Sequence, residues 1–180
     1  MKKYDVIILG SGSGLVVLEE AIAHGKKCAI VEKSKFGGTC LTRGCIPSKM
    51  LVYPADLIRE AETASRIGLE FSPTRLDFKR VGERMWRQIN VSSRIEANLK
   101  RQPGLDVYNG TAEFTGPRSI VVKTDDGGVS DELTADIIVV AVGARSFIPP
   151  ISGLETAGYI TNESFFGPAF PDEPWDSLII

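Results

Sequence analysis

A strand, a glycine-rich turn, a helix and a second strand follow one another at the start of this chain. The β-branched run YDVIIL, at positions 4–9, is typical of a strand that is buried on both faces. It leads into GSGSG and then into LVVLEEAIAHG, whose apolar residues recur at helical spacing before Gly25 ends the helix. Because CAIVE follows as a second strand, the sequence predicts a βαβ unit with a right-handed crossover.

The glycine turn has the features of a dinucleotide site. Gly10 and Gly12 allow a tight turn through which the backbone and the next helix can approach a pyrophosphate. The third glycine of G-x-G-x-x-G would fall at Leu15, although Gly14 is adjacent, so we expect looser packing of the helix on the strand. Glu32 stands twenty residues after Gly12, where a carboxylate can bind a ribose diol. These residues alone do not distinguish NAD from FAD.

The middle of the chain is predicted to be helical and the next part to form strands. A first helix follows position 50 and should be kinked by Pro54. A second should begin at the N-cap Asp77 and continue to Leu99. The short runs VY, TAEF, SIVVK and VSDEL predict a meander over about 105–135. The run DIIVVAV, at positions 136–142, predicts another buried strand.

Composition excludes several classes of partner. The 180 residues are 43% hydrophobic and 24% charged with a net charge of -2, so the chain lacks the basic excess that nucleic-acid binding requires. The apolar run near Met1 is too short for a signal peptide or a membrane span, and we therefore expect a cytoplasmic protein without a membrane partner. In that compartment, closely spaced cysteines are more often catalytic, redox-active or metal-binding than structural.

Two of the three cysteines, Cys40 and Cys45, lie in the segment GGTCLTRGCIPSK. Residues five apart in a regular helix have Cα atoms about 8.6 Å apart, whereas a disulfide needs a separation of about 6.8 Å or less. A disulfide here therefore requires a bent backbone, which Gly44 can adopt easily. Pro47 favours the first turn of a helix and so places Cys45 near its positive end, where a thiolate is stabilised.

The residues leave three interpretations of this pair open: a redox-active disulfide, two inert thiols and a zinc site. Inert thiols are common in protein cores. Zinc would need about four ligands, and outside the pair the chain offers only Cys28 and His24, without paired spacing, so we expect no metal site. His24 precedes Gly25 at a predicted helix end, where an imidazole commonly bonds the last carbonyls, so we expect no role as a base.

GGTCLTRGCIPSK closely resembles the redox-disulfide segment of the class I pyridine nucleotide-disulfide oxidoreductases. This flavin-dependent family includes dihydrolipoamide dehydrogenase and the glutathione, mercuric and mycothione reductases. The resemblance covers nearly the whole chain, through VIILGSGSG, VEK, GTAEF, IIVVAVGARSFIPPISG and TNESFF. The Pro-Ser-Lys ending looks most like dihydrolipoamide dehydrogenase and mercuric reductase, whereas SGLVVLEEA and CIPSKMLVYPAD look like mycothione reductase. Glu20 stands where glutathione reductases carry a substrate-binding Arg, which argues against glutathione.

The resemblance implies an incomplete Rossmann-like α/β fold. We expect an FAD-binding domain over 1–150, with helices on one face of a parallel sheet and a small β-meander on the other. A linker over 151–175 and the start of an NAD(P)-binding domain at 176–180 should follow. The chain is then expected to be the N-terminal, FAD-binding part of a longer homodimeric enzyme, whose C-terminal domain would supply a His-Glu base to the partner subunit.

The implied function is that of an FAD-dependent disulfide oxidoreductase, most like dihydrolipoamide dehydrogenase. Such an enzyme passes electrons between NAD(P) and a dithiol/disulfide substrate such as lipoamide, through the flavin and Cys40–Cys45. Mycothione reductase and mercuric reductase are alternatives within the family. A non-catalytic nucleotide-binding fragment that uses only the glycine turn is an alternative from another class.

The resemblance also assigns roles to individual residues. Cys45 would lie against the flavin as a charge-transfer partner, and Cys40 would be the interchange thiol that meets the substrate. Lys49 would lie near the flavin N5 and stabilise the reduced cofactor. The residues expected to contact the cofactor are Gly10, Gly12, Ser13, Gly14, Glu32, Lys33, Gly38, Thr39, Lys49, Ala112, Ala141 and Gly143.

The chain departs from the family pattern at two places near these residues. Val142 replaces the usual Thr of Ala-Thr-Gly and removes a hydroxyl near the flavin. Thr42 and Arg43 replace the usual Asn-Val between the cysteines, which adds a permanent positive charge beside the pair. We hypothesise that Arg43 favours the thiolate form of the pair.

Overall fold

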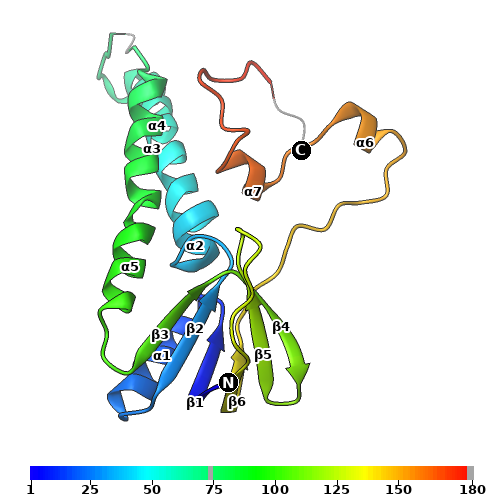
Figure 1. The fold of residues 1–180 in the computed structure, drawn as a ribbon. Helices are drawn as coiled ribbons and strands as arrows, with labels where there is room; N and C mark the ends of the chain where they lie inside the picture. Colours follow the sequence, from blue (N-terminus) through cyan, green and yellow to red (C-terminus); the bar gives the residue numbers. More distant parts are fainter. Residues whose placement is uncertain (73–74, 178–180) are drawn as a thin grey trace. The chain divides into compact units, whose positions relative to one another are not determined.

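The computed structural model describes residues 1–72 and 75–177, which divide into two compact units (Figure 1). We call Met1–Thr42 with Val91–Arg145 the sheet unit. The rest of the described chain, 43–90 and 146–177, is called the helical unit. In the part of the chain that the structure describes, no helix combines the length and the apolar character that crossing a bilayer requires.

The strands of the described residues form one sheet of six, in the order β3-β2-β1-β6-β5-β4. Four of them are parallel: β1 (Lys2–Leu9), β2 (Cys28–Glu32), β3 (Leu105–Asn109) and β6 (Leu133–Val140). Two further strands continue the sheet in antiparallel pairing: β5 (Ser119–Lys123) and β4 (Thr111–Gly116). The predicted βαβ unit is confirmed, since α1 (Gly14–Ala23) connects the parallel strands β1 and β2.

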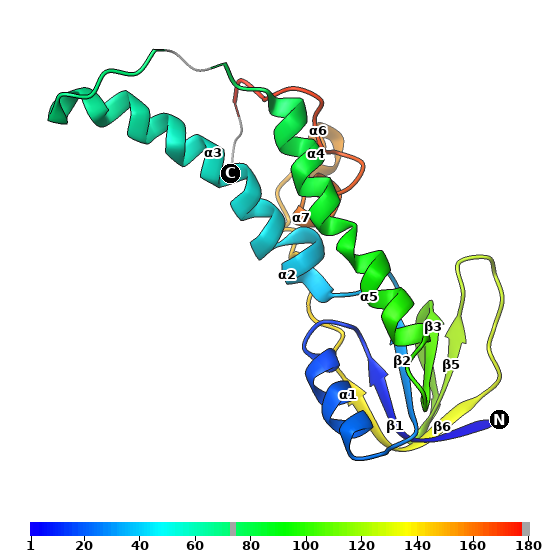
Figure 2. The ribbon, with the colours of Figure 1, turned by 90° about the vertical axis from the view of Figure 1, so that its left-hand side faces the viewer.

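Both faces of the parallel strands are buried, each by a different layer. On one face, Val6, Ile8 and Ile30 pack with side chains of α1 and, at its margin, of α5 (Val91–Lys100) (Figure 2). On the other face, Ile7 and Leu9 pack with side chains of β5. This alternation explains why YDVIIL is apolar throughout. The predicted Rossmann-like class, with helices on one face of a parallel sheet, is confirmed. The predicted start of the meander is wrong, because the run VY lies in β3 and pairs in parallel with β2, so only β4 and β5 provide the antiparallel strands.

Strand β6 differs from the prediction in its extent. The run VSDEL is not a separate strand, because Val129 makes only an isolated bridge to Lys123. The amide of Thr124 donates a 2.9 Å hydrogen bond to the carbonyl of Gly128, which closes a turn in this segment. Strand β6 begins later, at Leu133. The first four residues of VSDEL therefore precede β6, and the strand begins at the last residue of this run.

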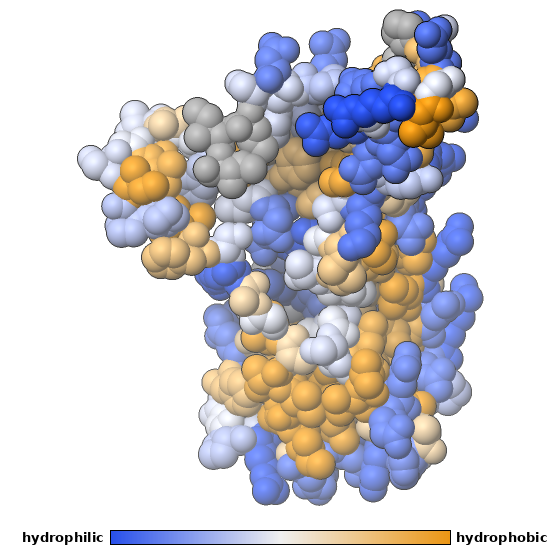
Figure 3. Space-filling model, turned by 180° about the vertical axis from the view of Figure 1, so that it is seen from behind, coloured by the Kyte–Doolittle hydropathy of each residue, from blue (hydrophilic) through white to orange (hydrophobic). Residues whose placement is uncertain are grey.

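Part of β6 is also more exposed than a buried strand would be. The side chains of Ile137 and Val140 are exposed, as are those of Val16 and Val17 in α1. Figure 3 shows apolar side chains gathered over the lower part of the face that it displays, in the sheet unit. The apolar pattern of DIIVVAV was therefore correct for a strand but wrong for its burial in the described chain.

The helical unit contains α3 (Cys45–Thr63), the short 3-10 helix η1 (Ala64–Ile67), α4 (Phe78–Ile89), α6 (Leu154–Ala157) and α7 (Asn162–Phe165). Helices α3 and α4 pack against each other, and Pro54 lies within α3. The predicted N-cap is confirmed, since the Asp77 carboxylate accepts a 3.0 Å hydrogen bond from the amide of Arg80. The predicted start of an NAD(P)-binding domain at 176–180 includes residues 178–180, which lie outside the described residues.

The predicted helix from Asp77 to Leu99 is two helices. Helix α4 ends at Ile89, Asn90 is a turn residue, and α5 begins at Val91. Asparagine is a weak helix former whose side chain competes with the backbone for hydrogen bonds, which favours an interruption there. The apolar periodicity continues across the break, so the sequence pattern alone did not reveal it.

Candidate functional site

The turn after β1 has no room for a side chain at Gly10. Gly10 has a φ of +96° and its amide donates a 2.8 Å hydrogen bond to the carbonyl of Val31. A Cβ atom on Gly10 would lie 2.4 Å from the carbonyl oxygen of Ala141. A Cβ atom on Gly38 would lie 2.5 Å from the Cα of Gly12. The turn, the end of β6 and the start of α2 (Gly38–Arg43) therefore meet through bare backbone.

Gly14 brings α1 close to the sheet. A Cβ atom on Gly14 would lie 2.6 Å from Cγ2 of Ile8 and 3.2 Å from the Cβ of Ala141. The expected loosening at Leu15 is therefore wrong, because the close contact is made one residue earlier than the G-x-G-x-x-G pattern would place it. Since α1 begins at Gly14, its N-terminus lies directly after the turn, where the amides of Leu15 and Val16 donate 3.2 Å hydrogen bonds to the carbonyls of Gly12 and Ser13.

Glu32 is buried and its carboxylate is held in place by neighbouring donors. The amide and the hydroxyl of Ser11 donate to Oε2 at 2.9 and 2.6 Å, and the amide of Ser34 donates to Oε1 at 2.9 Å. The Ser11 hydroxyl also accepts a 3.0 Å hydrogen bond from the amide of Gly37. Ser11 thus connects the glycine turn, the carboxylate and the turn before α2.

The sequence analysis missed Ser11, because the position between the two glycines carries no requirement in the fingerprint. A signal was available in the parallel pairing, since the register Leu9↔Val31 places the residues after β1 beside Glu32. A hydroxyl at that position can reach a carboxylate at the end of the neighbouring strand.

Ser11→Ala is expected to lower the free energy of unfolding by about 1–3 kcal/mol, because it leaves Glu32 and the amide of Gly37 each short of one buried hydrogen bond. Urea unfolding followed by circular dichroism measures this loss. Ser13→Ala is the matched control, since Ser13 is exposed and makes no capping bond at the start of α1, and it should change stability by less than about 0.5 kcal/mol. Equal losses in the two variants would contradict the assignment.

The other residues predicted to contact the cofactor belong to the sheet unit, except Lys49. Ser13, Lys33 and Thr39 are exposed, whereas Ala112 and Ala141 are half-buried. Gly143 follows β6, is exposed and has a φ of +69°. The structure brings the glycines, Glu32 and Ala141 into contact or close succession, and their role in binding remains a prediction.

The residues of this turn fit the pyrophosphate and ribose of a dinucleotide. Glycine backbone without side chains can approach a ligand closely, and the positive end of the dipole of the ten-residue helix α1 favours an anion at the turn. Oε1 of Glu32 accepts one bond from Ser34, and a carboxylate oxygen can accept a second from a ribose hydroxyl. These features suit FAD and NAD equally.

The two cysteines lie on either side of a break between helices. Cys40 is in α2, and Cys45 is the first residue of α3; both are exposed. Gly44 between the helices has a φ of -144° and a ψ of -119°, so the backbone is not helical there, as the sequence predicted. Pro47 is buried in the first turn of α3, which confirms that Cys45 lies at the helix N-terminus. Lys49 follows one turn later on the same side of α3.

Cys28 lies in the core of the sheet unit, and His24 has the environment that the sequence predicted. Cys28 is fully buried in β2, and burial, with a smaller contribution from the charge of Asp5, raises the pKa of its thiol. His24 follows α1, and its Nδ1 lies 3.0 Å from the carbonyl oxygen of Glu20. Among the described residues, no three His, Cys, Asp or Glu side chains are grouped so that they could hold a metal ion.

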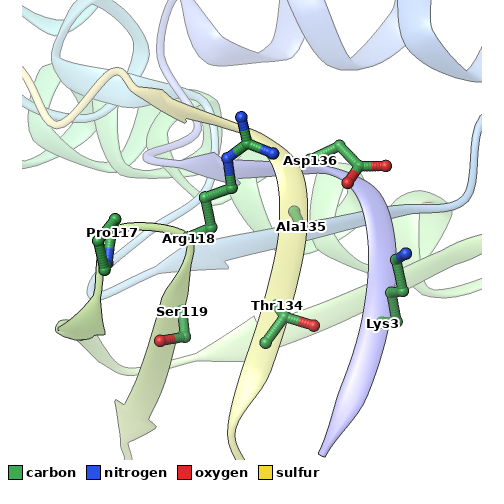
Figure 4. A pocket seen from close by; sticks show the side chains of 7 residues that line it. All are labelled: Lys3, Pro117, Arg118, Ser119, Thr134, Ala135 and Asp136. Atoms are coloured by element: carbon green, nitrogen blue, oxygen red, sulfur yellow. The ribbon is translucent and has the colours of Figure 1, made fainter.

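An open depression of about 440 Å³ lies elsewhere on the sheet unit (Figure 4). Its lining residues are Lys3, Pro117, Arg118, Ser119, Thr134, Ala135 and Asp136. Because Lys3 and Thr134 are near the starts of β1 and β6, the depression lies at the amino ends of these strands. Nucleotides bind at the carboxyl ends of parallel strands, where the glycine turn is, so the depression is not part of the candidate site.

The sequence of this chain is similar to those of known proteins. A family model for the pyridine nucleotide-disulphide oxidoreductases matches residues 4–167. Mycothione reductase of Mycobacterium tuberculosis is 36% identical over 169 residues, which cover 91% of this chain and 36% of the relative. Dihydrolipoyl dehydrogenase of Bacillus subtilis is 36% identical over 164 residues, which cover 87% of this chain and 34% of the relative.

The fold of this chain is also similar to that of a solved structure. The Cu(II) complex of the HOCl-induced flavoprotein disulfide reductase RclA from Escherichia coli superposes with a TM-score of 0.72 at 31% identity, over 87% of this chain and 32% of that protein. The chain thus spans about a third of the length of the proteins that it matches. The family model covers most of the sequence, including the glycine turn and both cysteines, and the chain therefore belongs to the pyridine nucleotide-disulphide oxidoreductase family.

Proposed function

We propose that this chain is the FAD-binding part of a flavin-dependent disulfide oxidoreductase, most like dihydrolipoamide dehydrogenase, that passes electrons between NAD(P) and a dithiol/disulfide substrate such as lipoamide. The observation that carries the proposal is the exposed pair Cys40 and Cys45, placed on either side of a non-helical glycine. Supporting observations are the nucleotide-compatible turn at Gly10 and the relatives named as disulfide reductases and as a dihydrolipoyl dehydrogenase.

The sheet unit would bind FAD, which supplies two-electron redox chemistry when bound. The backbone at Gly10 and Gly12 and the first amides of α1 would bind the pyrophosphate, and Glu32 would accept hydrogen bonds from the adenosine ribose. Ser11 would keep the Glu32 carboxylate oriented toward that ribose. Lys49, one turn from Cys45 on α3, would place a positive charge near the reacting groups.

The cysteines would exchange electrons with the substrate through sulfur chemistry. A thiolate of the dithiol substrate attacks Sγ of Cys40, and the Cys40–Cys45 bond breaks with its electron pair on Sγ of Cys45. The second substrate thiolate then attacks the mixed disulfide and releases Cys40 as a thiolate. The substrate is thereby oxidised to a disulfide, the cysteine pair takes up two electrons, and the two substrate protons are released. Cys45, which would receive this electron pair, is the first residue of α3.

The substrate follows from the proposal only as a class. Mycothione reductase and dihydrolipoyl dehydrogenase are equally similar to this chain, at 36% identity, so a low-molecular-weight thiol such as mycothiol is the alternative to lipoamide. Mercuric reductase is a further alternative, from the resemblance of the Pro-Ser-Lys segment. We also propose a homodimeric enzyme of the cytoplasm, on the resemblance to the family.

An anaerobic reductive titration tests the proposal. The intact protein with FAD is expected to take up two electron pairs per flavin, one for the cofactor and one for the Cys40–Cys45 disulfide. A nucleotide-binding module without redox cysteines would take up one pair, and this result would refute the proposal. Dithionite consumption followed by flavin absorbance, with thiols counted after each addition, measures both quantities.

A further inference from the structure

Arg43, which lies between the two cysteines, is held by two consecutive residues of α7. Nδ2 of Asn162 donates a 3.1 Å hydrogen bond to the carbonyl oxygen of Arg43. Nη1 of Arg43 lies 3.2 Å from Oε1 of Glu163. Both the backbone and the side chain of Arg43 are therefore tied to a segment that lies more than a hundred positions later in the sequence.

The orientation of Asn162 is fixed by its two partners. A backbone carbonyl can only accept, so the amide nitrogen of Asn162 must face Arg43. The remaining amide oxygen accepts a 3.0 Å hydrogen bond from the hydroxyl of Ser146. The first turn of α7 is itself ordered, because Ser164 Oγ accepts a 2.9 Å hydrogen bond from the amide of Thr161.

An aromatic cluster anchors α7 within the helical unit. The ring of Phe165 in α7 lies 5.5 Å from that of Phe170, and Phe170 stacks on Phe78 of α4 at 5.8 Å. Trp86 packs edge-on against Phe170 at 5.6 Å. Gly82 of α4 provides space for this ring, since a Cβ atom there would lie 3.1 Å from it. The aromatic cluster thus holds in place the helix that contacts Arg43.

We infer that α7 is a positioning element for the reactive cysteine: Asn162 holds the backbone before Gly44, and Glu163 restrains and balances the charge of Arg43 two residues before Cys45. The inference rests on the proposed function, because it assigns a role relative to the redox cysteines. The Arg43 side chain is 22% exposed and that of Glu163 is 49% exposed, so the pair adds little to stability. Its effect should be on the charge near Cys45.

Other charges near Cys45 are the same in every variant of the test. Lys49 lies one turn away on α3. Helix α4 also packs on α3; its N-cap Asp77 and its residues Arg80 and Arg84 lie beside Tyr53, Pro54 and Leu57. The other charged residues of α4 are Lys79, Glu83 and Arg87, and they too are the same in every variant. A change of reactivity on removal of Glu163 is therefore attributed to the Arg43 pair.

Glu163→Gln is expected to increase the alkylation rate of Cys45 in the reduced intact protein about threefold near pH 7, and to move the pH profile of the reaction to lower pH. The reason is that the carboxylate of Glu163 no longer offsets part of the positive charge of Arg43, which favours the thiolate by an amount typical of an exposed ion pair. The rates are measured with iodoacetamide from pH 5 to 9, and Cys45 is identified by peptide mass spectrometry.

Glu155→Gln is the matched control, since Glu155 is an exposed carboxylate of α6 in the same unit and its replacement removes the same charge. It should leave the profile unchanged. A profile of Glu163→Gln that coincides with that of the control, or that moves to higher pH, overturns the role of Glu163. A role of α7 in folding alone would lower stability and leave the profile where it is.

Asn162→Ala tests the backbone contact separately. Loss of the bond to the Arg43 carbonyl is expected to shift the equilibrium of the Cys40–Cys45 disulfide with dithiothreitol about fivefold toward the dithiol, the effect of about one hydrogen bond. An unchanged equilibrium removes Asn162 from the positioning role. If the anaerobic titration shows only one electron pair, the proposed function fails, whereas the alkylation profile of Cys45 still decides the inference about Glu163.

Discussion

Cys45→Ser in the intact protein with FAD is expected to reduce disulfide-reductase activity on the order of 10³-fold or more, down to the background rate. Serine cannot form the disulfide with Cys40 on which the proposed electron transfer depends. FAD should still bind, because the glycine turn and Glu32 are unchanged. Turnover with a lipoamide or mycothiol-type disulfide and the flavin content of the purified variant measure the two outcomes.

Cys28→Ala is the control for this variant, since Cys28 is fully buried and the raised pKa of its thiol makes it unreactive. It should lose only a modest amount of stability and keep its turnover. Thiol counting after denaturation gives an independent check. Within these 180 residues there are three cysteines, so peptides from this part of the reduced protein should be labelled at three thiols and those of the oxidised protein at Cys28 alone. Activity above about a tenth of the normal rate in Cys45→Ser would contradict the assignment.

The sequence predicted the parts of the fold that local patterns determine. A β-branched run before a glycine turn specifies a buried parallel strand, and β1 has the expected alternation of side chains between two covered faces. The N-cap at Asp77, the helix end at His24 and the helix start at Cys45 also follow from single residues whose backbone preferences are strong. These features required no knowledge of the tertiary structure.

The parts that the sequence did not predict depend on contacts between distant segments. Ser11 acquires its role because β1 and β2 are adjacent, and α7 acquires its role from Arg43 and the aromatic cluster. The pattern of residues 151–175 resembles a linker, rich in Pro and Gly, and contains only two helices of four residues. Such short helices have little intrinsic stability, so packing, not propensity, orders them.

The exposure of Ile137 and Val140 has a different origin. Burying an apolar side chain stabilises the folded protein, but another segment of the chain must pack over it. In β1, α1 and β5 supply it on the two faces, whereas β6 keeps these two side chains exposed in the described chain. Sequence patterning therefore identifies the strand correctly and leaves its burial to be determined by the tertiary structure.

Gly10→Ala is expected to lower the free energy of unfolding of the sheet unit by about 3–5 kcal/mol, from a left-handed backbone conformation and a steric clash together. The φ of Gly10 is +96°, and the added Cβ would lie 2.4 Å from the carbonyl oxygen of Ala141 and 2.9 Å from its carbonyl carbon. Backbone atoms cannot rotate away as a flexible side chain can. The end of β1 must therefore separate from the end of β6, where the amide of Ala141 donates a 2.8 Å bond to Leu9.

Gly25→Ala separates the two contributions. Gly25 has a φ of +67°, but no atom beyond its chain neighbours lies within 4 Å of an added Cβ, so only the conformational cost of about 1–2 kcal/mol applies. Urea unfolding of both variants gives the difference that is due to the clash. FAD affinity should fall for Gly10→Ala and stay constant for Gly25→Ala, because only the first displaces the backbone expected to bind the pyrophosphate. Equal losses of stability in the two variants would mean that Ala141 can move away from the added Cβ at little cost. The contact with β6 would then not fix the conformation of the turn.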